Sequence, residues 1–231
     1  KLMDLPWDKL PPHVREPTSY ASKPEVWLHA LETLPLLLNS NQQNQALYNS
    51  IKDEHDGTGE GEAKSIILWL DANIELRRPL DELYDIVLRD GIFLTTQEYR
   101  FPTTQFHHPS CIQQTGCDLA KTPDYSRQHA STAFIGMIPG TWWHNDVLPR
   151  VLNCSRNPTC INPIGSSRAN HRQDQSVVNG VLCALNAPPH LCHEDLKWRL
   201  SSDLEYDDLV EQLRRLDENH PYLHKIGRAH V

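Results

Sequence analysis

Ile66-Ile-Leu-Trp-Leu-Asp-Ala-Asn-Ile-Glu-Leu76 is the stretch that decides the fold, because five apolar residues run directly into Asp71. A short continuous apolar run bounded by charge is typical of a buried central strand that is covered on both faces. Ligands of open α/β sheets bind beyond the carboxyl ends of the strands. We therefore expect Asp71 to point into a ligand-binding cleft, with Asn73 on the same side of the extended chain. A simple turn explains the same two residues equally well, since Asp and Asn often terminate strands.

Helical and strand-like segments alternate on both sides of this stretch, which predicts an α/β domain. Apolar residues at spacings of three and four predict helices over 25–38, 79–90, 142–152 and 174–185, and a charged amphipathic helix over 204–216. Short apolar runs predict strands over 65–70, 91–96 and 130–137. Segments 39–64 and 98–129 are polar or rich in Pro and His and are expected to be irregular.

The size and charge of the chain restrict its class. Its 231 residues and 39% hydrophobic content suit one large globular domain, and the formal charge of −8 argues against non-specific nucleic-acid binding. No apolar run approaches the roughly 20 residues of a membrane span, and no signal-peptide pattern opens the sequence.

Both ends of the sequence have unusual features. It starts at Lys1 without Met, and Ile226-Gly-Arg-Ala-His-Val231 matches the translation of a common sequencing-adapter read. We therefore expect an N-terminally truncated domain over 1–200, a charged helical segment over 201–225 and an adapter-derived tail over 226–231.

The cysteines lie only in the second half of the chain. Their even number permits three disulfides, although reduced buried thiols are an alternative, and the sequence leaves the pairing open. Cys154 and Cys160 would close a short loop, and Asn153-Cys-Ser155 is a glycosylation sequon. These features favour a secreted or lumenal protein. The six are Cys111, Cys117, Cys154, Cys160, Cys183 and Cys192.

A second polar constellation, His171-Arg-Gln-Asp-Gln-Ser176, precedes the apolar helix predicted over 174–185. Asp174 suits a helix cap. It equally suits a carboxylate that accepts hydrogen bonds from ligand hydroxyl groups or holds a cation, while His171 or Arg172 meets a phosphate. Asn179 follows one turn and a residue after Asp174. The spacing does not choose between the two roles.

Four segments occur in one order: Tyr20-Ala-Ser-Lys-Pro24, Leu68-Trp-Leu-Asp-Ala-Asn-Ile74, Cys154 to Cys160 followed by Ile161-Asn-Pro-Ile-Gly165, and His171-Arg-Gln-Asp-Gln-Ser176. Through this ordered set, roughly over residues 7–186, the chain resembles a poorly characterised, nematode-rich family of predicted glycosyltransferases. That family has the nucleotide-diphospho-sugar transferase (GT-A) fold. The chain is more distantly similar to glycogenin-like and galactosyltransferase-like enzymes.

The resemblance implies a GT-A-like mixed, mostly parallel sheet flanked by helices. It also implies transfer of a sugar from a nucleoside-diphosphate sugar to a hydroxyl of a glycan or protein acceptor. The compartment would be the Golgi lumen, for a type II membrane parent whose anchor lies upstream, or the protein would be secreted. Nucleic acid is not an expected partner, and a membrane is expected only through that anchor.

The resemblance also assigns roles to residues. The related enzymes bind Mn²⁺ through an Asp-x-Asp motif at a strand end, and Asp71 and Asn73 stand in its place as ligands for Mn²⁺ or Mg²⁺. Asn73 removes one negative charge from that site. Asp71 and Asp174 are the expected catalytic residues, and the two must lie within about 15 Å of each other to share one site. The expected substrate-binding residues are Lys23, His171, Arg172, Gln175 and Asn179.

Two other functions remain open. A non-catalytic GT-A-like carbohydrate-binding or scaffold domain would have lost metal binding through Asn73. A histidine-rich metallohydrolase would use His107-His108 and His190-Leu-Cys-His-Glu194, but these lack zinc-site spacing and are interpreted as solvated histidines. Trp142-Trp143 suits either stacking on a sugar ring or anchoring of a helix to the core, of which the second is commoner.

Overall fold

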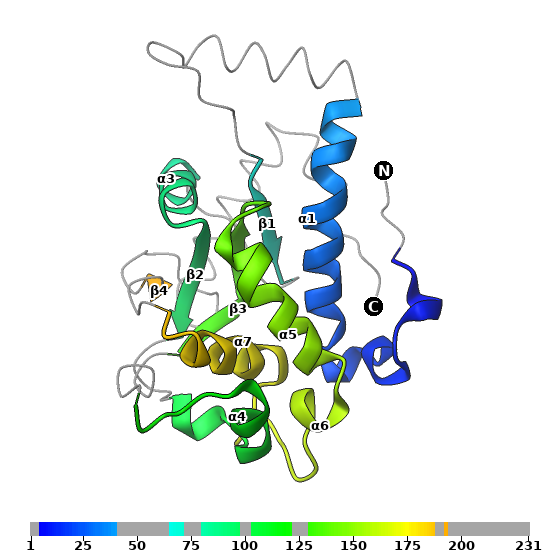
Figure 1. Cartoon of the computed structure of the whole chain (residues 1–231), viewed down its shortest axis with the longest axis vertical. Coiled ribbons are helices and arrows are strands. Elements are labelled where there is room, and N and C mark those ends of the chain that lie inside the picture. Colours follow the sequence, from blue (N-terminus) through cyan, green and yellow to red (C-terminus); the bar gives the residue numbers. More distant parts are fainter. Residues whose placement is uncertain are drawn as a thin grey trace, which may run out of the picture.

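The computed structural model describes residues 5–40, 65–71, 80–97, 103–121, 129–187 and 192–193. These residues contain a four-stranded sheet in the order β1-β3-β2-β4 (Figure 1). β3 is antiparallel to both of its neighbours, whereas β2 and β4 are parallel. Hence β1, β2 and β4 run in one direction and β3 in the other. The strands are β1 (Ile67–Leu70), β2 (Ile92–Gln97), β3 (His129–Met137) and β4 (Cys192–His193).

The expected mixture of helices and sheet is confirmed, but the expected mostly parallel sheet is wrong, because two of its three pairings are antiparallel. The reason lies in the segment between β2 and β3. Gln97 at the end of β2 pairs with His129 at the start of β3, so the chain re-enters the sheet beside the end of β2, where it left the sheet. Such a return reverses the strand, whereas a parallel neighbour needs a crossover. The return also makes β1 an edge strand of the described sheet, where a central strand was expected.

The helices agree with most of the sequence periodicity. Helices expected over 25–38, 79–90, 142–152 and 174–185 are present, but α4 lies within a segment that was expected to be irregular. The α-helices are α1 (Ser22–Ser40), α3 (Asp81–Asp90), α4 (Pro109–Thr115), α5 (Leu148–Ser155), α6 (Pro158–Ile161) and α7 (Gln173–Ala184). A π-helical segment, Trp143–Val147, leads into α5, and short 3₁₀ turns cover Trp7–Lys9, Pro12–Arg15, Pro17–Ser19 and Thr103–Phe106.

The sheet separates two hydrophobic clusters, because alternate residues of a strand face opposite sides. Ile135 and Met137 of β3 pack in the larger cluster with side chains of α1, α5 and α7. Phe134 of β3 and Phe93 of β2 pack in the smaller one with α3. α3 therefore covers one face of the sheet, and the other helices gather on the opposite side (Figure 1).

Gly136 allows α3 to lie close to the sheet. A Cβ atom at this position would stand 2.7 Å from Cγ2 of Val87 and 3.2 Å from Cβ of Phe93. Both neighbours are fully buried, so a larger residue would force the helix away from β3.

Two disulfides hold the helical side of the molecule. Cys154–Cys160 joins α5 to α6, with Cα atoms 5.3 Å apart, and is the short-loop pair that the sequence suggested. Cys117–Cys183 joins the end of α4 to α7, with Cα atoms 5.2 Å apart. Cys111 is a buried thiol. No helix in the described ranges combines the length and apolar character that a membrane crossing requires.

The pairing of β3 with β2 is interrupted between Leu94 and Thr95 of β2. Leu94 pairs with Ile135, but the next residue, Thr95, pairs with Ser131, so residues 132–134 of β3 have no partner on β2. Such irregularities bend a strand and change the direction of its side chains. Thr132 lies within this interruption.

Candidate functional site

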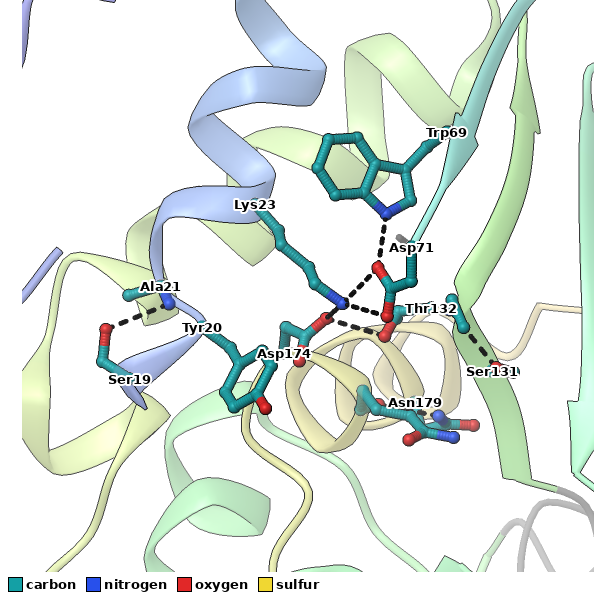
Figure 2. Close-up of polar contacts among 12 residues, drawn as sticks. Ser19, Tyr20, Ala21, Lys23, Trp69, Asp71, Ser131, Thr132, Asp174 and Asn179 are labelled. Carbon is teal, nitrogen blue, oxygen red and sulfur yellow. Dashed lines mark hydrogen bonds and ion pairs between the residues drawn. The ribbon is translucent and has the colours of Figure 1, made fainter. Parts of the chain in front are cut away.

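Lys23, Asp71 and Asp174 converge from three different elements (Figure 2). The Nζ atom of Lys23 lies 2.8 Å from Oδ1 and 2.9 Å from Oδ2 of Asp71. The same Nζ lies 3.3 Å from Oδ2 of Asp174. The exposed fractions of the three side chains are 13%, 26% and 6%, so the cluster is largely withdrawn from solvent with Asp71 on its open side. Two carboxylates that contact one ammonium meet the requirement of proximity for a shared site.

Asp71 is held where the sequence placed it, directly after β1. Its backbone N–H donates to the carbonyl of Ala133 at 2.8 Å, which extends the β1–β3 ladder beyond Leu70. The indole Nε1–H of Trp69 donates to Oδ1 of Asp71 at 3.0 Å. Trp69 itself rests edge-on against Trp27 of α1, with ring centroids 6.1 Å apart. Strand and helix together therefore orient this carboxylate.

Asp174 occupies the first turn of α7, but it makes no capping hydrogen bond, so the cap interpretation is wrong. Its Oδ2 instead accepts a hydrogen bond of 2.7 Å from the hydroxyl of Thr132 and contacts Lys23. The position favours a negative charge, because a helix N-terminus carries partial positive charge. The interrupted pairing of β3 places Thr132 where it can donate this bond.

Lys23 lies in the first turn of α1, where the helix dipole disfavours a cation. Its two carboxylate partners compensate for that location. Tyr20, just before α1, and Gln173, at the start of α7, have positive φ angles of 55° and 39°. Non-glycine residues in this region carry backbone strain, which is frequent at functional sites. The two helix starts that supply the cluster are both strained.

The charges of the cluster are strongly coupled. Burial lowers the pKa of Lys23, but Asp174 and Asp71 outweigh burial and leave that pKa above its ordinary value. Burial raises the pKa of Asp174, and the opposing effects of Lys23 and Thr132 do not cancel the rise. Lys23 is therefore a cation at neutral pH, and Asp174 accepts a proton more readily than an ordinary aspartate does.

A row of basic and aromatic side chains extends from the cluster. The Nζ of Lys23 lies 5.4 Å from the ring centroid of Tyr20, and the guanidinium of Arg168 lies 5.8 Å from the same ring. Arg168 also donates a hydrogen bond of 3.0 Å to the Tyr20 hydroxyl. Burial and the nearby charge of Arg168 lower the pKa of Arg172, whose guanidinium lies 4.6 Å from the Phe106 ring. Arg168 therefore adds positive charge beside Tyr20, and Arg172 adds positive charge near Arg168.

Sequence reasoning did not select Tyr20, Trp69, Thr132 or Arg168 as site residues. Tyr20 and Trp69 lie within the quoted motifs, so their nearness to Lys23 and Asp71 was a usable signal. Thr132 and Arg168 had no signal, because an interrupted strand pairing and a loop bring them to the site.

Three predicted substrate-binding residues are placed differently from Lys23. His171 is fully buried, and its Nε2 lies 3.0 Å from the carbonyl of Ile161. Burial lowers its pKa to about 4, so the ring is neutral at pH 7 and lends no positive charge to a phosphate. Gln175 is buried, and its Nε2 has no hydrogen-bond acceptor among the described residues. Asn179 is also buried, and Asn73 lies outside the described residues.

Asn179 connects α7 to β3. Its side-chain amide accepts from the backbone N–H of Ala130 and donates to the carbonyl of Ala130, both at 2.8 Å. It also donates to the carbonyl of Gln175 at 2.7 Å. With 1% exposure and these bonds, the side chain completes backbone pairing at the start of β3. We assign it a structural role.

Asn179→Leu is expected to lower the free energy of unfolding by about 3 kcal/mol, because it leaves buried backbone groups of Ala130 unpaired. Urea unfolding followed by circular dichroism measures this loss. Asn157→Leu is the matched control, since Asn157 is exposed and caps only the short α6. Equal losses in the two variants would contradict the structural role of Asn179.

The His and Trp side chains that suggested a metallohydrolase or stacking on a sugar ring occupy structural positions. His107 is buried beside the carbonyl of Ser176, so its interpretation as a solvated histidine is wrong. The Nδ1 of His108 accepts from the N–H of Ser110 and caps α4. Trp143 is fully buried, and the Nε1–H of Trp142 donates to the carbonyl of Asp90 at 3.1 Å, which fits anchoring to the core. The cluster over 190–194 is described only at its two strand residues.

The described residues fit a divalent cation poorly at the carboxylate pair. Both oxygens of Asp71 and one oxygen of Asp174 already contact Lys23, and a metal ion there would face the repulsion of the ammonium. One set of three cysteines has its sulfur atoms within 4.8 Å of one another, namely Cys111, Cys154 and Cys160. Two of these are joined as a disulfide, and thiolates are not the ligands that Mn²⁺ or Mg²⁺ prefers.

Comparison with protein-family models, curated proteins and solved structures gives no significant match to this chain. The geometry of the site therefore carries the functional argument.

Proposed function

We propose that the chain is a glycosyltransferase that moves a sugar from a nucleoside-diphosphate sugar to the hydroxyl of a glycan or protein acceptor. The observation that carries the proposal is the meeting of Asp71 and Asp174 at one Lys23 ammonium, beyond the carboxyl end of β1. A GT-A-like architecture and a place in the secretory lumen belong to the same proposal. The two disulfides are compatible with such a compartment.

Glycosyl transfer makes two chemical demands on a site. An acceptor hydroxyl must lose its proton, and the departing diphosphate must be stabilised as its negative charge grows. Asp174 suits the first role, because its raised pKa brings a buried carboxylate toward the pH at which it works as a base. Lys23, Arg168 and Arg172 suit the second role, because guanidinium and ammonium groups bind phosphate oxygens. Asp71 holds Lys23 in position.

Asp174→Asn keeps the size of the side chain but removes the base and its charge. We expect it to lower kcat of sugar transfer about a hundredfold while KM for the donor changes little, since general-base catalysis contributes about this factor. Radiolabelled transfer from a panel of nucleotide sugars to hydroxyl acceptors provides the rate. Asp146→Asn, at an exposed position of the π-helical segment, is the matched control and should retain full activity.

Two outcomes would count against the proposal. Absence of turnover with every nucleotide sugar, together with saturable binding of glycans, would favour the non-catalytic carbohydrate-binding alternative. Full activity of Asp174→Asn would show that the carboxylate pair is not the catalytic centre.

A further inference from the structure

We propose that Lys23 is the internal cation of this site, so that the chain binds the diphosphate group of its donor without a divalent metal ion. This inference rests on the proposed function and departs from the Mn²⁺ or Mg²⁺ that the resemblance implies. It follows from three observations on the described residues: which carboxylate oxygens contact Lys23, what surrounds the ammonium, and how the charges of the site balance.

The first observation concerns the oxygens that a metal ion would need. A hard divalent cation takes six or more oxygen ligands, of which protein sites supply several as carboxylates. Among the four carboxylate oxygens of Asp71 and Asp174, three lie within 3.3 Å of the Lys23 nitrogen. Asp71 also accepts a hydrogen bond from Trp69, and Asp174 accepts one from Thr132. The carboxylate pair is arranged around an ammonium ion.

The second observation concerns the ammonium itself. A lysine ammonium has three N–H donors. The Nζ of Lys23 contacts two oxygens of Asp71 and one of Asp174, and the side toward Tyr20 carries the cation–π contact at 5.4 Å (Figure 2). A phosphate oxygen that enters over Tyr20 would share these N–H donors with the carboxylates. The carboxylates would already hold the ammonium in place, so binding of the ligand would require little reorganisation of the site.

The third observation concerns the net charge of the site. Lys23 with two carboxylates would repel an anion, but Arg168 contacts the ring and hydroxyl of Tyr20, and Arg172 lies close enough to Arg168 for their charges to interact. Three basic groups against two acidic ones give this group of residues a net positive charge. A doubly or triply charged diphosphate is the ligand that this balance favours.

Inorganic pyrophosphate in the presence of EDTA is the probe of the anion site, and calorimetry of the whole chain is the measurement. Wild type is expected to bind pyrophosphate without metal. Lys23→Met is expected to weaken that binding by about tenfold or more, and Lys23→Arg by much less, because Arg retains the charge. Arg156→Met is the matched control, since it breaks the ion pair with Glu25 of the same helix α1 outside the cluster. It should bind pyrophosphate as wild type does.

Mn²⁺ alone is the second probe, measured by the electron paramagnetic resonance signal of the free ion. Wild type is expected to leave Mn²⁺ free at micromolar concentrations, whereas Lys23→Met releases two carboxylates and should gain affinity. This measurement on wild type does not depend on whether Lys23→Met folds, which circular dichroism checks.

Three binding results would overturn the inference. One is wild type that binds micromolar Mn²⁺ and loses it in Asp71→Asn. The others are wild type that fails to bind metal-free pyrophosphate, and a folded Lys23→Met that binds it as tightly as wild type. Sugar transfer that requires Mn²⁺ would refute the role of Lys23 and leave the glycosyltransferase standing. Metal-free pyrophosphate binding without any sugar transfer would support the role of Lys23 and refute the glycosyltransferase.

Discussion

Acidification from pH 6.5 to pH 4 is expected to remove about 6 kcal/mol from the free energy of unfolding, through two buried imidazoles. His107 and His171 are 4% and 0% exposed. Burial is the main reason why the pKa of each falls from 6.5 to about 4. A shift of this size corresponds to about 3 kcal/mol for each group. Because domains are typically stable by about 5–15 kcal/mol, the chain should unfold or come close to unfolding in this window.

The direction follows from which state binds protons. Below pH 6.5 the unfolded chain protonates both rings, whereas the folded chain keeps them neutral until about pH 4. Protons therefore favour the unfolded state throughout this interval. The contribution is fully present above pH 6.5 and is lost as the pH falls toward 4.

Urea unfolding at a series of pH values measures the effect. His171→Gln is expected to remove about half of the slope of unfolding free energy against pH, even though the variant is less stable at pH 7. His144→Gln is the matched control, because His144 is only partly buried at the start of the π-helical segment. A slope between pH 6.5 and 4 that is the same in all three proteins would contradict the buried, neutral rings.

Loss of the Cys117–Cys183 disulfide is expected to cost about 4 kcal/mol, from a loop-closure estimate. The bridge spans 66 residues, and a longer closed loop restricts the unfolded chain more strongly. Cys154–Cys160 spans only 6 residues and should contribute about 2 kcal/mol by the same estimate. The difference between the two losses is the sharper prediction, because the cysteines of both bridges are buried.

Double substitution to alanine of each pair avoids a leftover thiol. Urea unfolding of the two double variants gives the two losses directly. The variant without Cys117–Cys183 should also show a steeper dependence on urea, since its unfolded chain exposes more surface. If the short bridge proved as stabilising as the long one, constraint of the unfolded chain would not be the cause.

The sequence was sufficient for local structure around β1. A continuous apolar run that ends in an acid placed both the strand and Asp71 correctly, because burial of such a run and the polarity of its end are local properties. Helix α7 was predicted on the same basis, from the apolar spacing after Asp174. The order of motifs led us to expect Asp71 and Asp174 in one cleft, and both lie beside Lys23, whose contact with the two acids was not expected.

The parts that could not be predicted depend on non-local contacts. The reversal of β3 follows from where the chain re-enters the sheet, which strand periodicity does not encode. His107 was expected in solvent because it lies in a Pro-rich segment without zinc-site spacing, yet the ring is buried beside the carbonyl of Ser176. The sequence left Asp174 open between a helix cap and a ligand-binding carboxylate, and only the place of Thr132 in the interrupted strand reveals its partner. Propensity describes neighbours in sequence, while these outcomes depend on neighbours in space.

The insertion of β3 between β1 and β2 also determines when the site can form during synthesis. β1 has no described strand partner until β3 exists, and Asp174 follows only with α7. Lys23 and Asp71 therefore leave the ribosome long before the residues that enclose them. Pairing across such distances in the chain is slow, because the entropy of closing a long loop is lost before the stabilising contacts form. A ribosome-bound chain that stops short of α7 should lack the assembled cluster, so the charged site is among the last parts of the molecule to mature.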